Sequence, residues 1–234
     1  DSLPRDSGRM LPPLHVRVKP TNRCNHHCRY CAYTAEGLQL GQDMNRSDSI
    51  PREKMLEIVQ DFIDMGGKAV TFSGGGEPLA YPHLTEVLKK LAESTIKFAT
   101  LTNGALLQGE VAELFARRGT WVRVSMDGWD DASYAEYRGI SVGEFSKVME
   151  NMRSFKQLGG NCLLGVSYIV DQKNAEHVYE FVERIKDAGV DSLKISPCIV
   201  SNDGHKNNEY HSPMFSMVKE QIARAKDRFE ADGF

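Results

Sequence analysis

Long apolar runs are missing from this sequence. It contains no stretch of about 18 consecutive apolar residues, the length that a membrane-spanning helix needs. Its first residues also lack the charged segment followed by an apolar segment that marks a secretory leader. The hydrophobic fraction of 41% and the charged fraction of 26% are ordinary for a protein that folds in water. We therefore expect a cytoplasmic protein with no membrane partner.

An excess of charge of one sign is missing as well. The chain carries 29 Lys and Arg residues against 32 Asp and Glu residues, for a formal net charge of −3. Basic and acidic side chains alternate along the expected helices and do not form a basic stripe. Nucleic acid is recognised by such stripes, so it is not an expected partner.

Cysteine is scarce, and its distribution excludes a disulfide framework. Of the five cysteines, Cys24, Cys28 and Cys31 lie within eight positions, whereas Cys162 and Cys198 stand apart. Disulfide-rich secreted proteins spread an even number of cysteines over a short chain. An odd number, with three so close together, favours metal binding.

Short β-rich runs alternate with longer segments whose apolar residues recur with the period of a helix. Strands are expected at 14–19, 68–72, 96–101, 121–125, 162–170 and 192–196. This alternation implies parallel strands joined by helical crossovers. Six such units predict an α/β fold over residues 1–234, either a partial (β/α)6 TIM-like barrel or a doubly wound sheet. The longest connection, residues 34–49, is expected to be functional.

The unusual polar and glycine-rich segments follow the carboxyl ends of the expected strands. The three-cysteine loop follows the first strand, and Ser73-Gly74-Gly75-Gly76-Glu77-Pro78 follows the second. Thr102-Asn103-Gly104, Ser125-Met126-Asp127-Gly128 and Pro197-Cys198 follow the third, fourth and sixth. These ends form the functional face of parallel α/β folds, so we expect the loops to converge on one mouth.

The spacing C-x3-C-x2-C fits three kinds of site. A structural zinc ion takes four ligands, and His26 or His27 could complete Cys24, Cys28 and Cys31. The chain would then be a non-catalytic, zinc-stabilised α/β binding module. An iron–sulfur cubane also takes soft thiolates, and three of them leave one iron open for another ligand. Buried, inert cysteines are the third alternative.

The cysteine loop, with Tyr30 before its last cysteine, resembles the signature of the radical S-adenosylmethionine (SAM) superfamily. The motifs Gly75-Gly76-Glu77-Pro78 and Ser125-Met126-Asp127-Gly128 strengthen this resemblance, which spans residues 16–198. The second motif is similar to that of a branch whose members often carry a C-terminal SPASM or twitch domain. The resemblance implies a single core domain over residues 1–234, and an extension of that kind is expected to lie outside this sequence.

The resemblance implies a [4Fe-4S] cluster and SAM as cofactors. Cys24, Cys28 and Cys31 would each ligate one iron, and the amino and carboxylate groups of SAM would chelate the fourth. One-electron reduction, from a donor such as flavodoxin or ferredoxin, would cleave SAM to methionine and a 5′-deoxyadenosyl radical that abstracts hydrogen from the substrate. The branch favours a peptide or protein substrate, with a sugar or other small metabolite as the alternative.

The resemblance also assigns roles to residues of the other loops. Gly75 and Gly76 would let the backbone approach SAM, and Glu77 would meet its amino group. Ser125 and Asp127 would contact the ribose and methionine parts of SAM.

Six further residues complete the predicted site: Arg138, Tyr30, Asn103, Ser167, Val170 and Cys198. Arg138 would pair with the SAM carboxylate, Tyr30 would pack against the cluster or the adenine, and Asn103 would line the SAM pocket. Ser167 and Val170 would flank the adenine, although the family's G-x-I-x-G-x-x-E pattern is not clear around them. Cys198 is a hypothetical hydrogen-atom donor to a substrate radical, and a buried inert thiol is its plainer interpretation.

Overall fold

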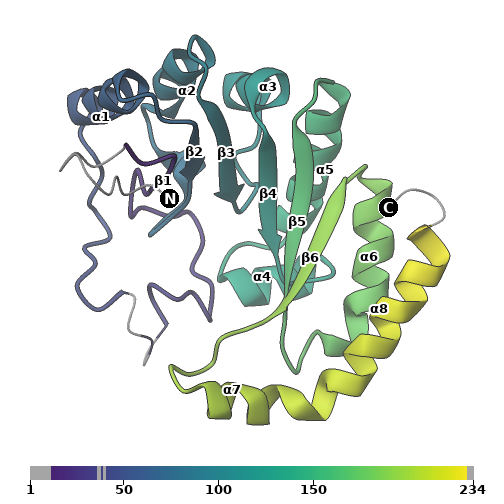
Figure 1. The fold of residues 1–234 in the computed structure, drawn as a ribbon. Helices are drawn as coiled ribbons and strands as arrows, with labels where there is room; N and C mark the ends of the chain where they lie inside the picture. Colours follow the sequence, from purple (N-terminus) through teal and green to yellow (C-terminus); the bar gives the residue numbers. More distant parts are fainter. Residues whose placement is uncertain (1–11, 36–37, 39–40, 231–234) are drawn as a thin grey trace, which may run out of the picture.

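The structure is a computed structural model that describes residues 12–35, 38 and 41–230, and these form one parallel sheet with helices around it (Figure 1). The strands are β1 His15–Val18, β2 Ala69–Phe72, β3 Lys97–Thr102, β4 Trp121–Met126, β5 Leu163–Val170 and β6 Ser192–Pro197. The helices are α1 Arg52–Asp64, α2 Leu84–Ala92, α3 Gly109–Arg118, α4 Asp131–Arg138, α5 Glu144–Gln157, α6 Val178–Asp187, α7 Gly204–His211 and α8 Phe215–Phe229. Short 3-10 turns are η2 Pro78–Ala80, η3 Ala175–His177 and η4 Ser212–Met214.

The strands pair in the order of the sequence, and all five pairings are parallel. A doubly wound sheet would reverse its strand order at one point. The prediction of a partial (β/α)6 barrel is therefore confirmed, and the doubly wound alternative is wrong. Among the described residues β1 and β6 do not pair, so the barrel is open along one side. The expected strands match the observed ones to within one residue at each end.

Helix α1 illustrates why the segments between the strands are helical. Pro51 is the residue before the helix, and Glu53 lies in the first turn, where the helix dipole favours an acidic side chain. Met55, Val59 and Phe62 recur at helical spacing, and all three are buried. Helix α1 therefore packs against the sheet through this apolar face. No helix in the described part of the chain has the length and apolarity to cross a bilayer.

The outer face of the sheet carries the hydrophobic core. Side chains alternate between the two faces of a strand, and on this face Phe98 and Tyr168 are fully buried with the helices. The Tyr168 ring stacks on Phe181 of α6 with centroids 3.9 Å apart, and Phe98 meets Phe115 of α3 at 5.5 Å. The helices are thereby fixed on one face of the sheet.

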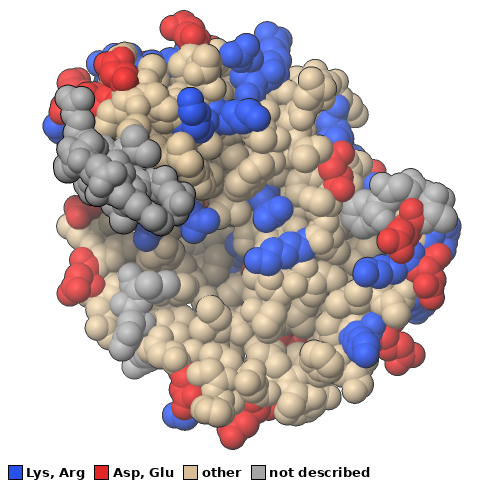
Figure 2. All heavy atoms as spheres, viewed as in Figure 1, with Lys and Arg blue, Asp and Glu red and all other residues tan. Residues whose placement is uncertain are grey.

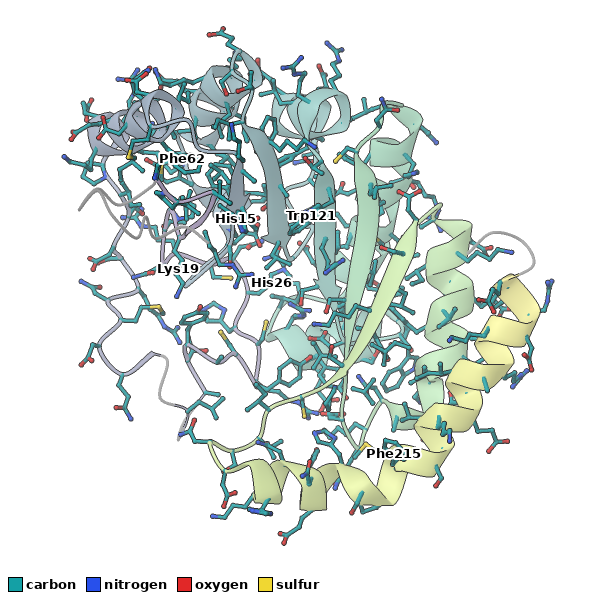
Figure 3. All side chains as sticks on the ribbon, viewed as in Figure 1. His15, Lys19, His26, Phe62, Trp121 and Phe215 are labelled. Atoms are coloured by element: carbon teal, nitrogen blue, oxygen red, sulfur yellow. The ribbon has the colours of Figure 1, made fainter. Side chains whose placement is uncertain are left out.

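The inner face of the sheet is the one seen in Figure 1. Figure 3 labels His15 and Trp121 on this face and Lys19 just beyond the end of β1. In Figure 2 this side is hollowed, and Lys and Arg side chains lie over its centre. Leu163, at the start of β5, is 57% exposed there. The inner face is thus open to a partner, unlike the outer one.

Asn174 joins the carboxyl ends of β4 and β5. Its side chain is fully buried, and Nδ2 donates to the carbonyls of Asp127 and Ile169 at 2.6 and 2.8 Å. Its Oδ1 accepts the N–H of Asp171 at 2.8 Å. One side chain therefore satisfies three backbone groups where the two strands end, which fixes the loop carrying Asp127.

Asn174→Ala should destabilise the fold, because it leaves two buried carbonyls and one buried N–H unpaired. We expect a loss of about 2–4 kcal/mol in the free energy of unfolding, measured by urea denaturation. Asn208→Ala on the exposed side of α7 is the matched control and should change stability by less than about 0.5 kcal/mol. Equal stability of both variants would show that Asn174 does not have this role.

Candidate active site

The cysteine loop is attached on one side to the loop that follows β2. The Gly76 N–H donates to the carbonyl of Thr21 at 3.1 Å, and the Glu77 N–H donates to the carbonyl of Arg23 at 2.8 Å. Asn22 extends these contacts to the long connection, since its N–H donates to the carbonyl of Asp48 at 2.8 Å. The segment immediately before the first cysteine is therefore held at both edges.

On its other side the cysteine loop is attached to the end of α4. The His27 N–H donates to the carbonyl of Arg138 at 2.7 Å, and the Arg29 N–H donates to the carbonyl of Tyr137 at 3.2 Å. These are carbonyls of the last helical turn, which have no partner inside their own helix. Gly139 follows at φ 59°, a conformation that suits glycine and closes the helix. The last carbonyls of α4 thus receive hydrogen bonds from backbone N–H groups of the cysteine loop.

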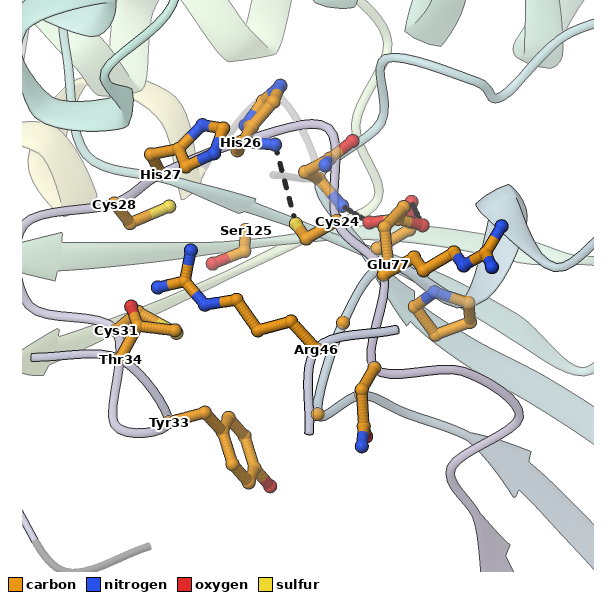
Figure 4. A pocket seen from close by; sticks show the side chains of 18 of the residues that line it. Cys24, His26, His27, Cys28, Cys31, Tyr33, Thr34, Arg46, Glu77 and Ser125 are labelled. Carbon is orange, nitrogen blue, oxygen red and sulfur yellow. Dashed lines mark hydrogen bonds between the residues drawn. The ribbon is translucent and has the colours of Figure 1, made fainter. Parts of the chain in front are cut away.

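The three cysteines open into one pocket of about 380 Å³ at the carboxyl ends of β1 to β4 (Figure 4). Its volume is that of a site for a small molecule. Cys24 is exposed, and Cys28 and Cys31 are partly exposed, so these thiols are not the inert, buried kind. The predicted site residues that line this pocket are Cys24, Cys28, Cys31, Gly75, Gly76, Glu77, Asn103, Ser125 and Arg138. The segments at the ends of β1 to β4 therefore converge on one mouth as predicted, whereas Cys198 after β6 does not line it.

Glu77 is the carboxylate of this pocket and is only 3% exposed. Its Oε1 accepts the Leu79 N–H at 3.0 Å and the Thr102 hydroxyl at 2.6 Å, and its Oε2 accepts the Asn103 N–H at 2.7 Å. Burial raises the pKa of Glu77 above its ordinary value, although these hydrogen bonds act in the opposite direction. A carboxylate oxygen can accept two hydrogen bonds, so Oε2 retains one acceptor position for a ligand.

The glycines before Glu77 allow two protein segments to approach each other. A Cβ on Gly76 would lie 2.0 Å from the carbonyl oxygen of Arg23, and one on Gly75 would lie 2.4 Å from Oδ1 of Asn22. A side chain on Gly76 would meet the backbone of the cysteine loop and push it away, whereas one on Gly75 would meet the ends of the Asn22 and Met44 side chains. The structure thus gives Gly76 a role in placing the loop, and the contact of both glycines with SAM stays a prediction.

Arg138 crosses the base of the pocket and is only 4% exposed. Its Nε donates to Asp127 at 2.9 Å, Nη2 donates to the carbonyl of Ser125 at 2.7 Å, and Nη1 donates to the sulfur of Cys28 at 3.4 Å. Burial acts to lower the pKa of Arg138, but Asp127 and the other acidic groups around it together outweigh burial, and the pKa is raised. The residue predicted to pair with the SAM carboxylate is therefore a buried cation that already has three partners, and that pairing stays a prediction.

Asp127 lies behind the pocket and does not line it. Its carboxylate is fully buried, pairs with Arg138 and accepts the hydroxyl of Tyr30. Burial, followed by this carboxylate, raises the pKa of Tyr30. Direct contact of Asp127 with SAM stays a prediction, whereas its contact with Arg138 is present in the structure.

Tyr30 and Cys198 line a second pocket of about 480 Å³ near the ends of β5 and β6, which also includes Arg29 and Lys173. Cys198 is 4% exposed, with its sulfur 4.0 Å from Nε2 of His211, and burial raises the pKa of its thiol. The thiol therefore keeps its hydrogen at neutral pH, which donation of a hydrogen atom requires.

Ser167 and Val170 face opposite sides of β5, because they are three residues apart on a strand. Ser167 is half-buried on the inner face, whereas the side chain of Val170 is 3% exposed and belongs to the core. The side chain of Val170 is therefore directed away from the face that carries Ser167, and the placement of the adenine beside these residues stays a prediction. The role of Ser167 stays a prediction.

His26, one of the two potential zinc ligands, points away from the cysteines (Figure 4). Its ring is buried and meets Tyr134 edge-on, with centroids 6.1 Å apart, and neither ring nitrogen has a hydrogen-bond partner among the described residues. Burial lowers the pKa of His26 to about 3. Within the described ranges, no three His, Cys, Asp or Glu side chains are placed to hold one metal ion. This geometry gives no support to a mononuclear zinc site.

Arg46 is a pocket residue that the sequence analysis missed. It lines the cavity, and Figure 4 shows its guanidinium between Cys28 and Cys31. It comes from the long connection after the first strand, next to Asn45, whose carbonyl accepts Nδ2 of Asn22 at 2.8 Å. The length of this connection was the available signal, but it did not identify a particular residue.

Comparison with known proteins agrees with this geometry. The sequence profile of the Radical SAM superfamily matches residues 18–182. This chain belongs to the radical SAM superfamily. The match begins at Val18, the last residue of β1, and covers strands β2 to β5 and every loop that lines the three-cysteine pocket.

Individual relatives are distant. The chain is similar to the probable GTP 3′,8-cyclase of Sulfolobus acidocaldarius, with 28% identity over 190 residues that cover 80% of this chain and 56% of that protein. It is similar to the serine-type anaerobic sulfatase-maturating enzyme of Bacteroides thetaiotaomicron, with 29% identity over 214 residues, 85% of this chain and 49% of that protein. The chain thus spans about half the length of the curated relatives it matches.

A solved structure gives the same result for the fold. Native anSMEcpe with bound AdoMet and Kp18Cys peptide superposes with a TM-score of 0.72 and 20% identity, covering 95% of this chain and 62% of that one. This likeness shows the partial barrel.

Radical SAM enzymes use a [4Fe-4S] cluster and SAM, and the pocket suits both. Three thiols supply the soft ligands that iron–sulfur clusters take, and they do not converge on a single ion. Glu77 offers an acceptor to an amine, and the Ser125 hydroxyl lines the same cavity. The donor set therefore fits the cofactors of the family.

Gly76→Ala should reduce the iron that the protein binds, because the added methyl group displaces the cysteine loop from Arg23. We expect loss of most of the iron after anaerobic reconstitution, with an unchanged circular dichroism spectrum. Gly204→Ala is the control, since a Cβ there meets nothing within 4 Å and its iron content should match wild type. Full iron loading of Gly76→Ala would contradict this account of the loop.

Proposed function

We propose that this chain is the SAM- and cluster-binding core domain of an enzyme that modifies a peptide or protein by abstracting hydrogen. The observation that supports it best is the meeting of Cys24, Cys28 and Cys31 with Glu77 and Ser125 in one pocket. The cysteines and Glu77 lie in the loops after β1 and β2, and Ser125 lies near the carboxyl end of β4, so the fold itself assembles the site.

Some residues of the pocket would bind the cluster or SAM, and others would hold those residues in position. We propose that Cys24, Cys28 and Cys31 hold the cluster and that Glu77 and Ser125 bind SAM, with Glu77 receiving its amino group at Oε2. Arg138 already pairs with Asp127, so Arg46, for which the described residues provide no ion pair, is the freer cation for the SAM carboxylate. When bound and reduced, the cofactors supply cleavage of the SAM C–S bond and a 5′-deoxyadenosyl radical.

The Arg138 guanidinium also supports Cys28. A charged N–H donor at 3.4 Å from its sulfur favours the thiolate, which is the form that ligates iron. Burial, by contrast, raises the pKa of Cys28, and the Arg138 charge partly offsets this effect. We therefore propose Arg138 as a positioning residue for both Asp127 and Cys28.

The peptide substrate is supported by relatives and not by the pocket itself. One relative is named as a sulfatase-maturating enzyme, another as the subtilosin biosynthesis protein AlbA, and the solved neighbour holds a peptide. Relatives named as a GTP cyclase and a pre-heme d1 synthase support a small metabolite as the alternative. A flavodoxin or ferredoxin as electron donor and a cytoplasmic location remain predictions.

Cys28→Ala should abolish SAM cleavage, because the cluster would lose one of its three thiolate ligands. The measurement is 5′-deoxyadenosine by chromatography after anaerobic reconstitution and reduction, together with absorbance near about 400 nm. Cys162→Ala is the matched control, since this buried thiol belongs to the core at the start of β5. It should retain both signals.

Two outcomes would contradict the proposed chemistry. The first is a wild-type protein that holds an intact cluster but forms no 5′-deoxyadenosine from SAM. The second is a colourless protein that binds one zinc ion tightly and takes up no iron or sulfide.

Cys198→Ala should stop substrate turnover but not SAM cleavage, if the thiol donates a hydrogen atom to the substrate radical. Cys198 lines the second pocket beside the ends of β5 and β6, and burial raises the pKa of its thiol. The assay compares product with 5′-deoxyadenosine in the same reaction. Unchanged turnover in this variant would leave Cys198 as a buried, inert cysteine.

A further inference from the structure

The inner face of the sheet carries cations and no acid. Side chains that share this face are identified by strand register, which places Arg17, Lys97, Arg123 and Lys194 on it together with His15. None of the inner-facing positions of the six described strands carries Asp or Glu. Figure 2 agrees, with Lys and Arg over the centre of the hollow. Although the chain is nearly neutral overall, the charged side chains on the inner face of the sheet are therefore all positive.

These cations differ from those on the helices. On the outer surface Lys54, Lys89 and Lys156 each pair with a carboxylate within 2.7 Å. No carboxylate within the described residues forms an ion pair with Lys97 or Lys194, and both side chains are exposed. Unpaired charges of one sign in a concave surface add to one another, so this face attracts anions.

Arg123 is a cation of the inner face with a buried donor atom that lacks an acceptor among the described residues. Its Nε is buried and has no hydrogen-bond partner among the described residues. The residue opposite on β5 is Gly165, where a Cβ would lie 3.4 Å from that nitrogen, so glycine leaves room for the guanidinium. On the other side the guanidinium lies over the Trp121 ring, 5.5 Å from its centroid. A buried donor without an acceptor favours a ligand that supplies one.

The cationic face is continuous with the three-cysteine pocket. Ser125, which lines that pocket, pairs in register with Ser167, and Ser167 pairs with Lys194. These three residues form one row across β4, β5 and β6. Arg123 lies in the next row, two residues before Ser125. An anion held by Lys194 and Arg123 would therefore lie beside the three-cysteine pocket.

We propose that the inner face binds an acidic segment of a peptide substrate, with Asp or Glu side chains next to the residue that is modified. This rests on the proposed function and specifies its substrate. The cations are spread over β1, β3, β4 and β6 and do not surround one point, as they would for a single phosphate group. Separate charges along a groove match several carboxylates along an extended chain. Hydroxyls of Ser167 and Ser192 between them can bond to a peptide backbone.

Binding of charged peptides to the reconstituted, SAM-bound protein tests this inference. The probes are fluorescein-labelled octaglutamate and octaglutamine, followed by fluorescence anisotropy at low and high salt. We expect octaglutamate to bind about tenfold more tightly, and the preference to fade as salt screens the charges. The double variant Lys97→Gln/Lys194→Gln should weaken octaglutamate binding about threefold to tenfold.

The matched control is Lys206→Gln/Lys219→Gln, which removes two charges from exposed positions of α7 and α8. It should change octaglutamate binding by less than about twofold. Equal binding of the two peptides, or equal weakening in both double variants, would overturn the inference. So would inorganic triphosphate that binds where octaglutamate does not, because it would indicate a phosphorylated metabolite. Formation of 5′-deoxyadenosine by the same preparation separates these failures from a failure of the proposed function.

Discussion

The buried guanidinium of Arg138 is the contact on which the rest of this site depends. Its side chain reaches Asp127 and Ser125 at the end of β4 and the sulfur of Cys28, and its carbonyl accepts the N–H of His27. One residue thereby joins a strand end, a helix end and the cysteine loop. Removing it would leave Asp127 as a fully buried carboxylate without its cation, which costs more free energy than the pair itself contributes.

Much of the fold could be predicted from the sequence, because packing imposes its own periodicity. The outer face of the sheet needs apolar side chains at alternate strand positions, and each helix needs them every third or fourth residue. Both patterns are readable in β5 and α1. The strand order was open at that stage, since the same alternation fits two topologies, and hydrogen-bond partners between distant strands decide it.

The parts of the site that could be predicted from the sequence are those where the residue type and its spacing indicate the chemistry directly. Three thiols at fixed spacing and a glycine-rich loop with Glu77 are local signals, and they lie in one pocket. Asp127 and Val170 show the limit of such signals. The motif identifies Asp127, but only the structure shows that its carboxylate is turned toward Arg138. For Val170 the structure adds that strand alternation directs its side chain into the core. Helix α4, which holds the loop in place, has too little apolar periodicity to be expected from sequence.

In the part of the chain that the structure describes, β1 and β6 do not pair, and this has a geometric consequence. In a closed barrel the number of strands and their stagger fix the radius, so the width of the mouth cannot change without a change of topology. Six strands that stop short of closure have no fixed circumference. Their twist can tighten or splay while the hydrogen bonds between neighbours and the packing of the outer helices are kept. An incomplete barrel can therefore hold its cofactor loops rigidly on the β1 to β4 side and adjust the opposite side, around β5 and β6, to the bulk of what enters.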